Sequence, residues 1–325
     1  MTVTIIRRIL QSVIVVFAMS IIVFFVVNVV GDPVYMFASP DATQDEIQRV
    51  IEQFGLDQPV YIQYWRFISG AFQGDLGNSY VFGEPALRLI VERMPATLEL
   101  AFFSLILSVV LGIPLGLYAG LKPDSPMSKT IMAASIFGFS LPTFWVGIML
   151  IMLFAVILGW LPSTGRGDTV TVLGFETSLL TLDGLRHLFL PALNLALINI
   201  SLVIRLTRAG TREAIHQDYI KFARAKGLST RRIIGVHLLK NIMIPVVTVL
   251  GLEFGSLIAF SVVTETIFAW PGMGKLLIDA IQQLDRPIIV AYLMIIVLLF
   301  VFINLLVDIA YSVLDPRVRL KAASA

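Results

Sequence analysis

Cysteine is absent from the 325-residue sequence, which excludes disulfides, thiolate metal sites and cysteine nucleophiles. Only three histidines occur, and His187, His216 and His237 lack the spacing to one another or to carboxylates that a metal site needs. Charged residues make up 14% of the chain and hydrophobic residues 57%, whereas a soluble domain is about a quarter charged. The net charge of +2 is too small to indicate a nucleic-acid partner. The composition therefore favours a membrane protein.

A phosphate-binding loop of the form Gly-x-x-x-x-Gly-Lys-Ser/Thr is also absent. In the nearest stretch, Gly272 to Lys275 is followed by Leu276, and Ala269 stands where the first glycine belongs. The apolar runs contain no Ser/His/Asp or paired-Asp arrangement typical of an intramembrane protease. We therefore predict that the chain is not an enzyme and holds no cofactor or metal, and that any ATP is hydrolysed by another chain.

Six apolar runs are long enough to cross a membrane, for which about 20 residues are needed at 1.5 Å per residue. We place the spans at Ile9–Val30, Leu98–Leu121, Ile131–Trp160, Leu188–Leu206, Ile244–Phe268 and Ile288–Tyr311. The third run is long enough to bend, and Pro142 gives a reason for a bend. The sequence predicts an all-α, polytopic membrane protein of about six transmembrane helices.

Basic residues predict the orientation, because they concentrate on one side of a six-span arrangement. They are Arg7, Arg8, Lys122, Lys129, a cluster from Arg205 to Lys240, and Arg317, Arg319 and Lys321. This side is cytoplasmic by the positive-inside rule, which puts both termini in the cytoplasm. On the other side, residues 32–96 carry nine Asp and Glu against four Arg. Trp160 and Trp270 fall at the predicted outer boundaries, where indoles prefer to lie.

These assignments divide the chain into four parts. Residues 1–31 form the cytoplasmic N-terminus and first span, 32–96 an extracytoplasmic segment, 97–312 a five-helix core with a cytoplasmic loop at 209–240, and 313–325 a cytoplasmic tail. The extracytoplasmic segment shows amphipathic periodicity and capping signals for three short helices, at Thr43–Gly55, Pro59–Ile68 and Pro85–Met94. In the second helix we expect Tyr61, Trp65 and Ile68 to be buried. The segment either caps the outer end of the bundle or contacts a soluble partner.

Glycines recur in two predicted spans at spacings that share one helical face. They are Gly112, Gly116 and Gly120 in one span, and Gly251 and Gly255 in the other. Small residues at such spacing let helix backbones approach closely in lipid. We expect tight helix packing at both places, within the chain or between subunits.

Carboxylates within spans are rare, since a charge at the bilayer centre costs about 2.5–3.5 kcal/mol. Glu99 and Asp308 lie near span ends, which favours capping or ion-pair roles. Glu253 and Glu265 are twelve residues apart and so lie roughly on one helical face.

That face suits a polar translocation pathway, although Glu265 beside Trp270 is equally suited to a gate or an outer anchor. Asn194 and Asn199 are further pathway candidates, with interhelical hydrogen bonding as the alternative.

The basic loop between the fourth and fifth spans has the signals of a short exposed helix. Asp218 is suited to cap a helix over Tyr219–Lys226, Gly227 to take the left-handed position after it, and Ser229 to cap the next helix. The second helix would lead into the span that begins near Ile244.

Such a helix suits docking to another protein. Tyr219 and Phe222 can act as anchors, and the small side chains of Ala223 and Ala225 allow close approach. The surrounding Lys and Arg would bind anionic lipid headgroups equally well, so the pattern leaves both roles open.

The loop from His216 to Arg232 resembles the coupling-helix motif of binding-protein-dependent ABC importer permeases, and more narrowly that of the dipeptide, oligopeptide, nickel and glutathione permease family. Other stretches across nearly the whole chain are similar to that family: Arg7-Arg8, Gly31–Pro33, Pro95–Leu100, Ser140–Phe144, Gly159–Pro162, Thr264–Phe268, Trp270–Gly272, Asn304–Asp308 and Leu314–Arg317. The pattern looks most like the first of the two permeases that such systems usually encode.

One departure narrows the resemblance. The broad ABC importer motif begins with Glu-Ala-Ala six residues before its glycine, where this chain has Lys221, Phe222 and Ala223. The peptide branch also lacks that glutamate, so no contact that needs a carboxylate at position 221 is carried over.

The resemblance implies a type I ABC importer permease fold in the inner (plasma) membrane of a prokaryote. The implied function is that of a permease subunit of an ATP-driven importer for di- or oligopeptides or a related solute such as glutathione or a nickel chelate. The implied partners are a homologous second permease, two subunits that bind ATP and Mg, and a soluble extracytoplasmic solute-binding protein. The loop residues implied to contact the ATPase are Tyr219, Lys221, Phe222, Ala223, Arg224, Ala225, Lys226, Gly227 and Leu228.

Two functions of another class compete with this interpretation: a stand-alone secondary transporter or channel, and a structural membrane scaffold. Ion-coupled carriers usually show internal repeats, and we see no convincing repeat here.

Overall fold

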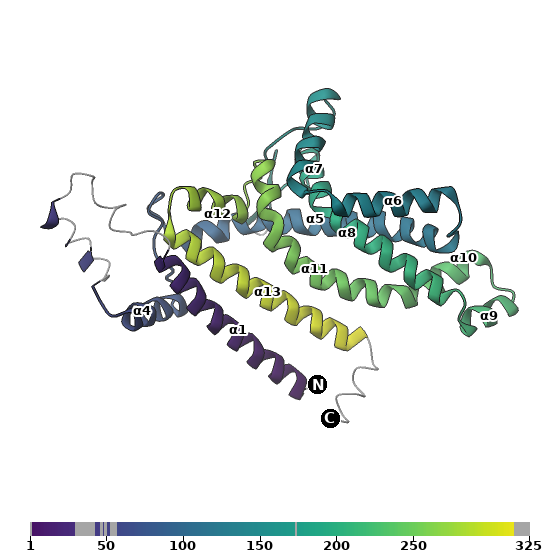
Figure 1. Ribbon diagram of the computed structural model, residues 1–325, viewed down its shortest axis with the longest axis horizontal. Helices are drawn as coiled ribbons and strands as arrows, with labels where there is room; N and C mark the ends of the chain where they lie inside the picture. Colours follow the sequence, from purple (N-terminus) through teal and green to yellow (C-terminus); the bar gives the residue numbers. More distant parts are fainter. Residues whose placement is uncertain are drawn as a thin grey trace. The chain divides into compact units, whose positions relative to one another are not determined.

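The computed structural model describes residues 2–29, 43–45, 48, 51–52, 57–172 and 174–314, and it is almost wholly helical (Figure 1). Its helices are α1 (Thr2–Val29), α4 (Val60–Phe72), α5 (Ala86–Leu121), α6 (Pro126–Ser140), α7 (Thr143–Leu150), α8 (Leu182–Ala214), α9 (Asp218–Ala225), α10 (Thr230–Arg232), α11 (Leu239–Ile267), α12 (Met273–Gln282) and α13 (Arg286–Leu314). Two π-helical segments, η1 (Ile151–Ile157) and η2 (Ile233–Leu238), continue α7 and precede α11. A small hairpin pairs β1 (Val170–Val172) antiparallel with β2 (Phe175–Thr177).

The chain forms two compact units. Among the described residues, one unit comprises those of Pro95–Lys275 and those from Phe302 to Leu314, and the other comprises those of Thr2–Met94 and Leu276–Val301. The first unit contains most of α5, the helices α6 to α11 and the basic loop. The second contains α1, α4 and the first half of α13.

The all-α membrane fold predicted from the sequence is confirmed. Within the described residues, α5, α8, the continuous helix Thr230–Ile267 and the stretch Arg286–Val307 are each long and apolar enough to cross a membrane. The pair formed by α6 and α7–η1 becomes a fifth span if its two arms are counted together. The first predicted span corresponds to α1, whose described side chains form a shorter apolar stretch at Leu10–Phe25.

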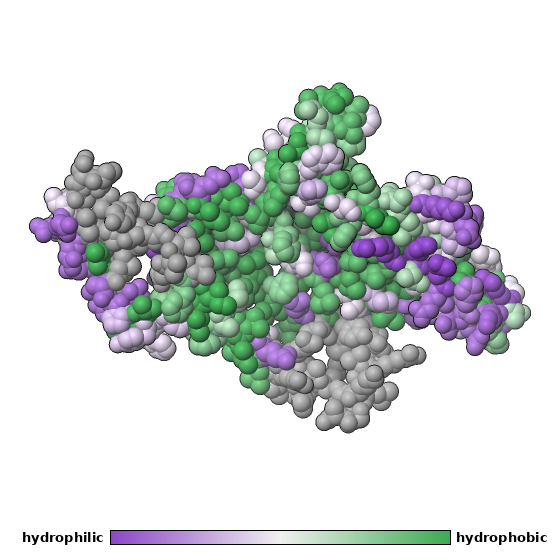
Figure 2. All heavy atoms as spheres, viewed as in Figure 1, coloured by the Kyte–Doolittle hydropathy of each residue, from purple (hydrophilic) through white to green (hydrophobic). Residues whose placement is uncertain are grey.

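The bend predicted at Pro142 in the third span is present, and it is sharp enough to divide the span into two arms. The helix axis turns by 110° between Pro126–Ser140 and Thr143–Ile157. Leu141 has extended backbone angles (φ −83°, ψ 139°), as expected of a residue before proline, and Pro142 caps α7. The arm α7–η1 is coated with hydrophobic residues (Figure 2), including the exposed side chains of Trp145 and Val156.

The glycine stripe of α5 packs within the chain against α8. A Cβ on Gly116 would lie 2.6 Å from the carbonyl oxygen of Ile204, and a Cβ on Gly112 would lie 2.7 Å from Val203. Only glycine permits this approach of the two backbones, so the predicted tight packing is confirmed. Likewise, a Cβ on Gly251 of α11 would lie 2.8 Å from Val307 of α13.

The predictions for residues 32–96 hold in part. The second predicted helix is present as α4, but Tyr61 and Trp65 are exposed rather than buried. The third is not separate, because α5 runs unbroken from Ala86 through Pro95 into the span. The first predicted helix lies largely outside the described residues. So do the stretch Gly31–Pro33, the tail from residue 315, and the side chains of Arg7, Arg8 and Asp308.

Candidate functional site

The short helix α9 ends in a glycine-dependent turn. Gly227 has a positive φ of 73°, and the amide of Gly227 donates to the Arg224 carbonyl (2.9 Å) while that of Leu228 donates to the Ala223 carbonyl (3.3 Å). These two bonds form a Schellman motif, which needs a left-handed residue at this position. The predicted left-handed conformation of Gly227 at the end of α9 is thus confirmed. Asp218, in contrast, is the first helical residue and not the cap, since Gln217 takes the cap position.

The inner face of α9 is held by the hydrophobic core. Ile220 and Ala223 are buried in a cluster with residues of α8, η2 and α11, among them Val203, Leu238 and Ile242. Burying a side chain the size of isoleucine contributes about 1.5–3 kcal/mol. The close approach expected at Ala223 is therefore to the chain's own bundle, and only Ala225 of the two alanines is exposed.

The outer face of α9 presents aromatic rings within a basic surface. Phe222 is 61% exposed and Tyr219 38% exposed, and the Lys226 ammonium lies 4.5 Å from the centre of the Phe222 ring. A 2.9 Å hydrogen bond from the Lys221 ammonium stabilises the Asp218 carboxylate and lowers the pKa of Asp218 from its ordinary value. Figure 2 shows hydrophilic residues gathered over this end of the unit.

A continuous helix connects α9 to the fifth span. Ser229 has cap backbone geometry and receives the amide of Ile233, but through its carbonyl, and its side chain forms no cap bond. From Thr230 the chain runs as α10, η2 and α11 without a break to Ile267. Ile233 and Leu238, five residues apart in η2, are both buried, which matches the wider π-helical turn.

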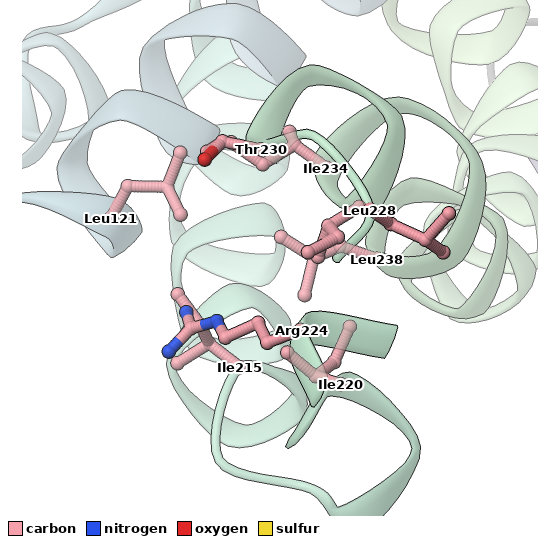
Figure 3. Close-up of a pocket in the computed structure, with 9 residues that line it drawn as sticks. Leu121, Ile215, Ile220, Arg224, Leu228, Thr230, Ile234 and Leu238 are labelled. Carbon is pink, nitrogen blue, oxygen red and sulfur yellow. The ribbon is translucent and has the colours of Figure 1, made fainter. Parts of the chain in front are cut away.

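A cavity of about 210 Å³ lies between α9 and this continuous helix (Figure 3). Seven of the side chains that line it are aliphatic; the other two are those of Arg224 and Thr230. In Figure 3 the Arg224 guanidinium extends to lie beside Ile215, and Leu121 from the end of α5 lies above the guanidinium on the same side of the view. The predicted cytoplasmic loop 209–240, which contains α9 and is called the α9 loop below, is thus anchored by Ile220 but has a cavity on one side of that anchor.

Glu265 occupies a fully buried position near the other end of α11. Its carboxylate accepts hydrogen bonds from Thr97 Oγ1 and Ser261 Oγ, both 2.8 Å, and from the backbone amide of Lys275 at 3.0 Å. The backbone of Gly272 passes so close that any Cβ there would meet the carboxylate. The carboxylate therefore binds α5, α11 and the start of α12 together.

Trp270 belongs to the same buried group. Its indole N–H donates to the Ala96 carbonyl at 2.9 Å, and its ring is fully buried. The indole of Trp270 therefore finds its hydrogen-bond partner inside the protein, and its predicted position at the outer boundary stays a prediction. Trp160 is 60% exposed, as a boundary residue would be.

Glu99 forms the ion pair expected of it. Arg166, just before the β1–β2 hairpin, donates to its carboxylate at 2.6 Å, and the backbone amide of Ser178 after the hairpin donates at 2.8 Å. Both charged side chains are nearly buried, at 11% and 4% exposure for Arg166 and Glu99. Sequence reasoning missed Arg166 because its partner is 67 residues away.

The two asparagines of α8 that the sequence predicts for the pathway are buried in the unit. Asn194 Nδ2 donates to Thr264 Oγ1 at 3.0 Å. The side-chain oxygens of Asn194 and Asn199 are buried and accept no hydrogen bond from any residue that the structure describes. Glu253 is half-buried, apart from the Glu265 group. Nowhere in the described part of the chain do three His, Asp or Glu side chains gather as metal ligands.

Two family models together match nearly the whole chain. The family model described as "Binding-protein-dependent transport system inner membrane component" matches residues 112–320, and the model of the N-terminal region of such components matches residues 1–101. The chain is similar to an oligopeptide transport system permease protein of Bacillus subtilis, with 39% identity over 97% of this chain and 98% of the relative. It is also 38% identical to a glutathione transport system permease protein of Escherichia coli, over 98% and 99% of the two chains.

A third relative is a di/tripeptide transport system permease protein of Pseudomonas aeruginosa, 37% identical over 93% of this chain and 94% of the relative. Among solved structures, the inward-facing MetNI methionine ABC transporter shares the fold, with a TM-score of 0.53 at 17% identity over 70% of this chain and 97% of that chain.

Proposed function

Because the chain belongs to the family of binding-protein-dependent transport system inner-membrane components, which are permease subunits of ATP-driven importers, we propose that it forms half of a translocation pathway for a di- or oligopeptide or a related small solute. In this proposal the α9 loop transmits ATPase motion to the pathway. The chain itself makes and breaks no bond, and ATP and Mg are held by partner subunits.

The observation that carries the coupling role is the division of α9 into two faces. Its outer face offers Phe222 and Tyr219 as anchors for a partner, and its inner face is fixed to the bundle through Ile220. The Gly227 turn joins α9 to the uninterrupted helix Thr230–Ile267. A displacement of α9 would therefore move α11 as well, which suits a helix that switches access between two sides of a membrane.

The proposed complex contains a homologous second permease, two ATP-binding subunits and a soluble extracytoplasmic solute-binding protein. The apolar coat of the α7–η1 arm supports contact with another membrane subunit. The basic surface around α9 supports a cytoplasmic position for this loop and, with it, for both termini.

For the pathway we propose Asn194, Asn199 and Glu253 as polar contacts and Glu265 as the residue that holds its outer end. The unsatisfied side-chain oxygens of Asn194 and Asn199 support this assignment, since buried acceptors without partners are rare in proteins. Glu265 is engaged by three neighbouring elements, which suits positioning of the pathway wall.

The test is co-purification of the permease with its ATPase subunits, followed by solute uptake in proteoliposomes. We expect Phe222→Ala to lower ATPase recovery about 30-fold, the effect of losing a 2 kcal/mol interface anchor. Ile14→Ala is the control, because Ile14 is a 66% exposed apolar residue of α1, which belongs to the other compact unit. Solute uptake by the chain alone, with no ATPase present, would instead establish a stand-alone carrier.

A further inference from the structure

Helix α4, in the unit that contains α1, has three faces of different character. One face packs on α1: the rings of Tyr64 and Phe67 lie 5.4 Å and 5.9 Å from that of Phe24, and Tyr64 hydrogen-bonds Ser20 at 2.8 Å. A second face carries Arg66, with Ser69 and Gln73 one and two turns further along. The packing of α4 on α1 is visible in Figure 1, where α4 lies beside the Val29 end of α1.

The third face is aromatic, and no element that the structure describes covers its rings. Its members recur at i, i+4, i+7 and i+11 and form the stripe Tyr61, Trp65, Ile68 and Phe72. Tyr61 is 73% exposed, Trp65 70% and Phe72 88%. Their number makes this face unlike a scatter of single surface hydrophobics, which needs no explanation.

We propose that this stripe inserts into the headgroup region of the bilayer and makes α4 an interfacial anchor of the extracytoplasmic segment. This inference is independent of the proposed transport function. Trp and Tyr favour membrane–water boundaries because they combine an apolar ring with a polar edge. An amphipathic helix with a polar face and an aromatic face lies in the interface plane, with its apolar side about 5–10 Å into the boundary region.

Continuity with the lipid-facing surface of α1 identifies lipid as the occupant. At the level where Ser20 and Phe24 contact α4, the neighbouring α1 side chains Ile22 and Phe25 are each 51% exposed. In a membrane-spanning helix these apolar side chains face acyl chains. The stripe on α4 thus belongs to a helix that packs on α1 at the level of these exposed apolar side chains, and α4 carries no acidic residue that anionic headgroups would repel.

The absence of cysteine makes the test direct, because single-cysteine variants need no background substitutions. Trp65→Cys and Arg66→Cys, adjacent in sequence but on different faces, are spin-labelled in proteoliposomes without any soluble partner. Collision with lipid-soluble oxygen and with a water-soluble nickel complex is measured by electron paramagnetic resonance. We expect the label at position 65 to collide mainly with oxygen, at a depth of about 5–10 Å, and the label at position 66 mainly with nickel.

Equal nickel access at positions 65 and 66 would overturn the proposal. Exclusion of both reagents from position 65 would also overturn it, because the stripe would then be buried against a protein chain. Protection of position 65 that arises only when the solute-binding protein is added would assign the stripe to that partner instead. Phe72→Cys, with Gln73→Cys as its control, repeats the measurement about two helical turns further along α4. This second pair tests the proposal even if the protein does not fold with a cysteine at position 65.

Discussion

Substitution of Gly227 changes one backbone position in the α9 loop without introducing a steric clash. A Cβ at this position would meet no heavy atom within 4 Å, so the side chain itself has room. The effect comes from the φ of 73°, a conformation that costs an L-residue about 1–2 kcal/mol. Valine should have the largest conformational cost of the substitutions because its branched Cβ is the most restricted, and alanine should have a smaller one. Asparagine should have the smallest cost, since its side chain tolerates the left-handed region.

A penalty of one or two kcal/mol changes a conformational equilibrium about 5- to 30-fold. Gly227→Val should therefore reduce by that factor the population in which Leu228 bonds to the Ala223 carbonyl and α9 is held at its present angle. We expect ATPase recovery with the permease to fall, or ATP hydrolysis to continue without matching uptake. The two quantities are measured together in proteoliposomes, with Gly227→Asn and Gly227→Ala as intermediate members of the series.

Gly235 supplies the matched control within the same loop. A Cβ there also meets nothing within 4 Å, but the backbone of Gly235 is not left-handed. Gly235→Ala should leave assembly and uptake close to wild type. Wild-type assembly and uptake in Gly227→Val, or an equal defect in Gly235→Ala, would refute the reasoning from backbone conformation.

Three further predictions concern the helix contacts. Gly116→Val should lower the melting temperature of the purified protein because its Cβ would lie 2.6 Å from a backbone oxygen of α8, whereas Gly138→Ala, with 3.7 Å of clearance, should leave it nearly unchanged. Glu99→Gln should destabilise the protein by about 3–5 kcal/mol, because it leaves the nearly buried Arg166 without its counter-charge; a melting temperature equal to wild type would contradict the ion pair. Glu265→Gln should alter uptake over a substrate titration without reducing ATPase recovery, and unchanged uptake would remove its proposed role at the pathway.

Local signals in the sequence predict much of the α9 loop. The turn at Gly227 follows from the requirement for a left-handed residue, which few side chains satisfy, and the two-sided character of α9 follows from the helical spacing of Ile220 and Phe222. The break before α7 is likewise predictable, because Pro142 restricts its own backbone and that of the preceding residue. Each of these depends on residues within one or two turns of each other.

Contacts between distant segments could not be predicted in this way. The pairing of Glu99 with Arg166 depends on how the β1–β2 hairpin lies beside α5, and no local pattern encodes that. The sequence predicts the wrong face of α4 to be buried. Aromatic side chains stand both on the face with Tyr64 and on the face with Trp65, so periodicity alone does not show which face packs. The face that packs is determined by contacts with α1, where Ser20 and Phe24 contact the hydroxyl and the ring of Tyr64.

The π-helical segment η2 absorbs one residue of extra chain length between the α9 loop and α11. Ile233 and Leu238 share a face at a spacing of five, whereas residues on one face of the α-helix that follows recur at a spacing of about four. Deleting one residue of η2 would return this turn to the α-helical repeat, and the side chains before and after it would keep nearly their present directions. The same deletion in the α-helical part of α11 has no wide turn to absorb it, and everything that precedes it would rotate by about 100° around the helix axis. A family member one residue shorter at η2 would therefore still present Phe222 in the same direction.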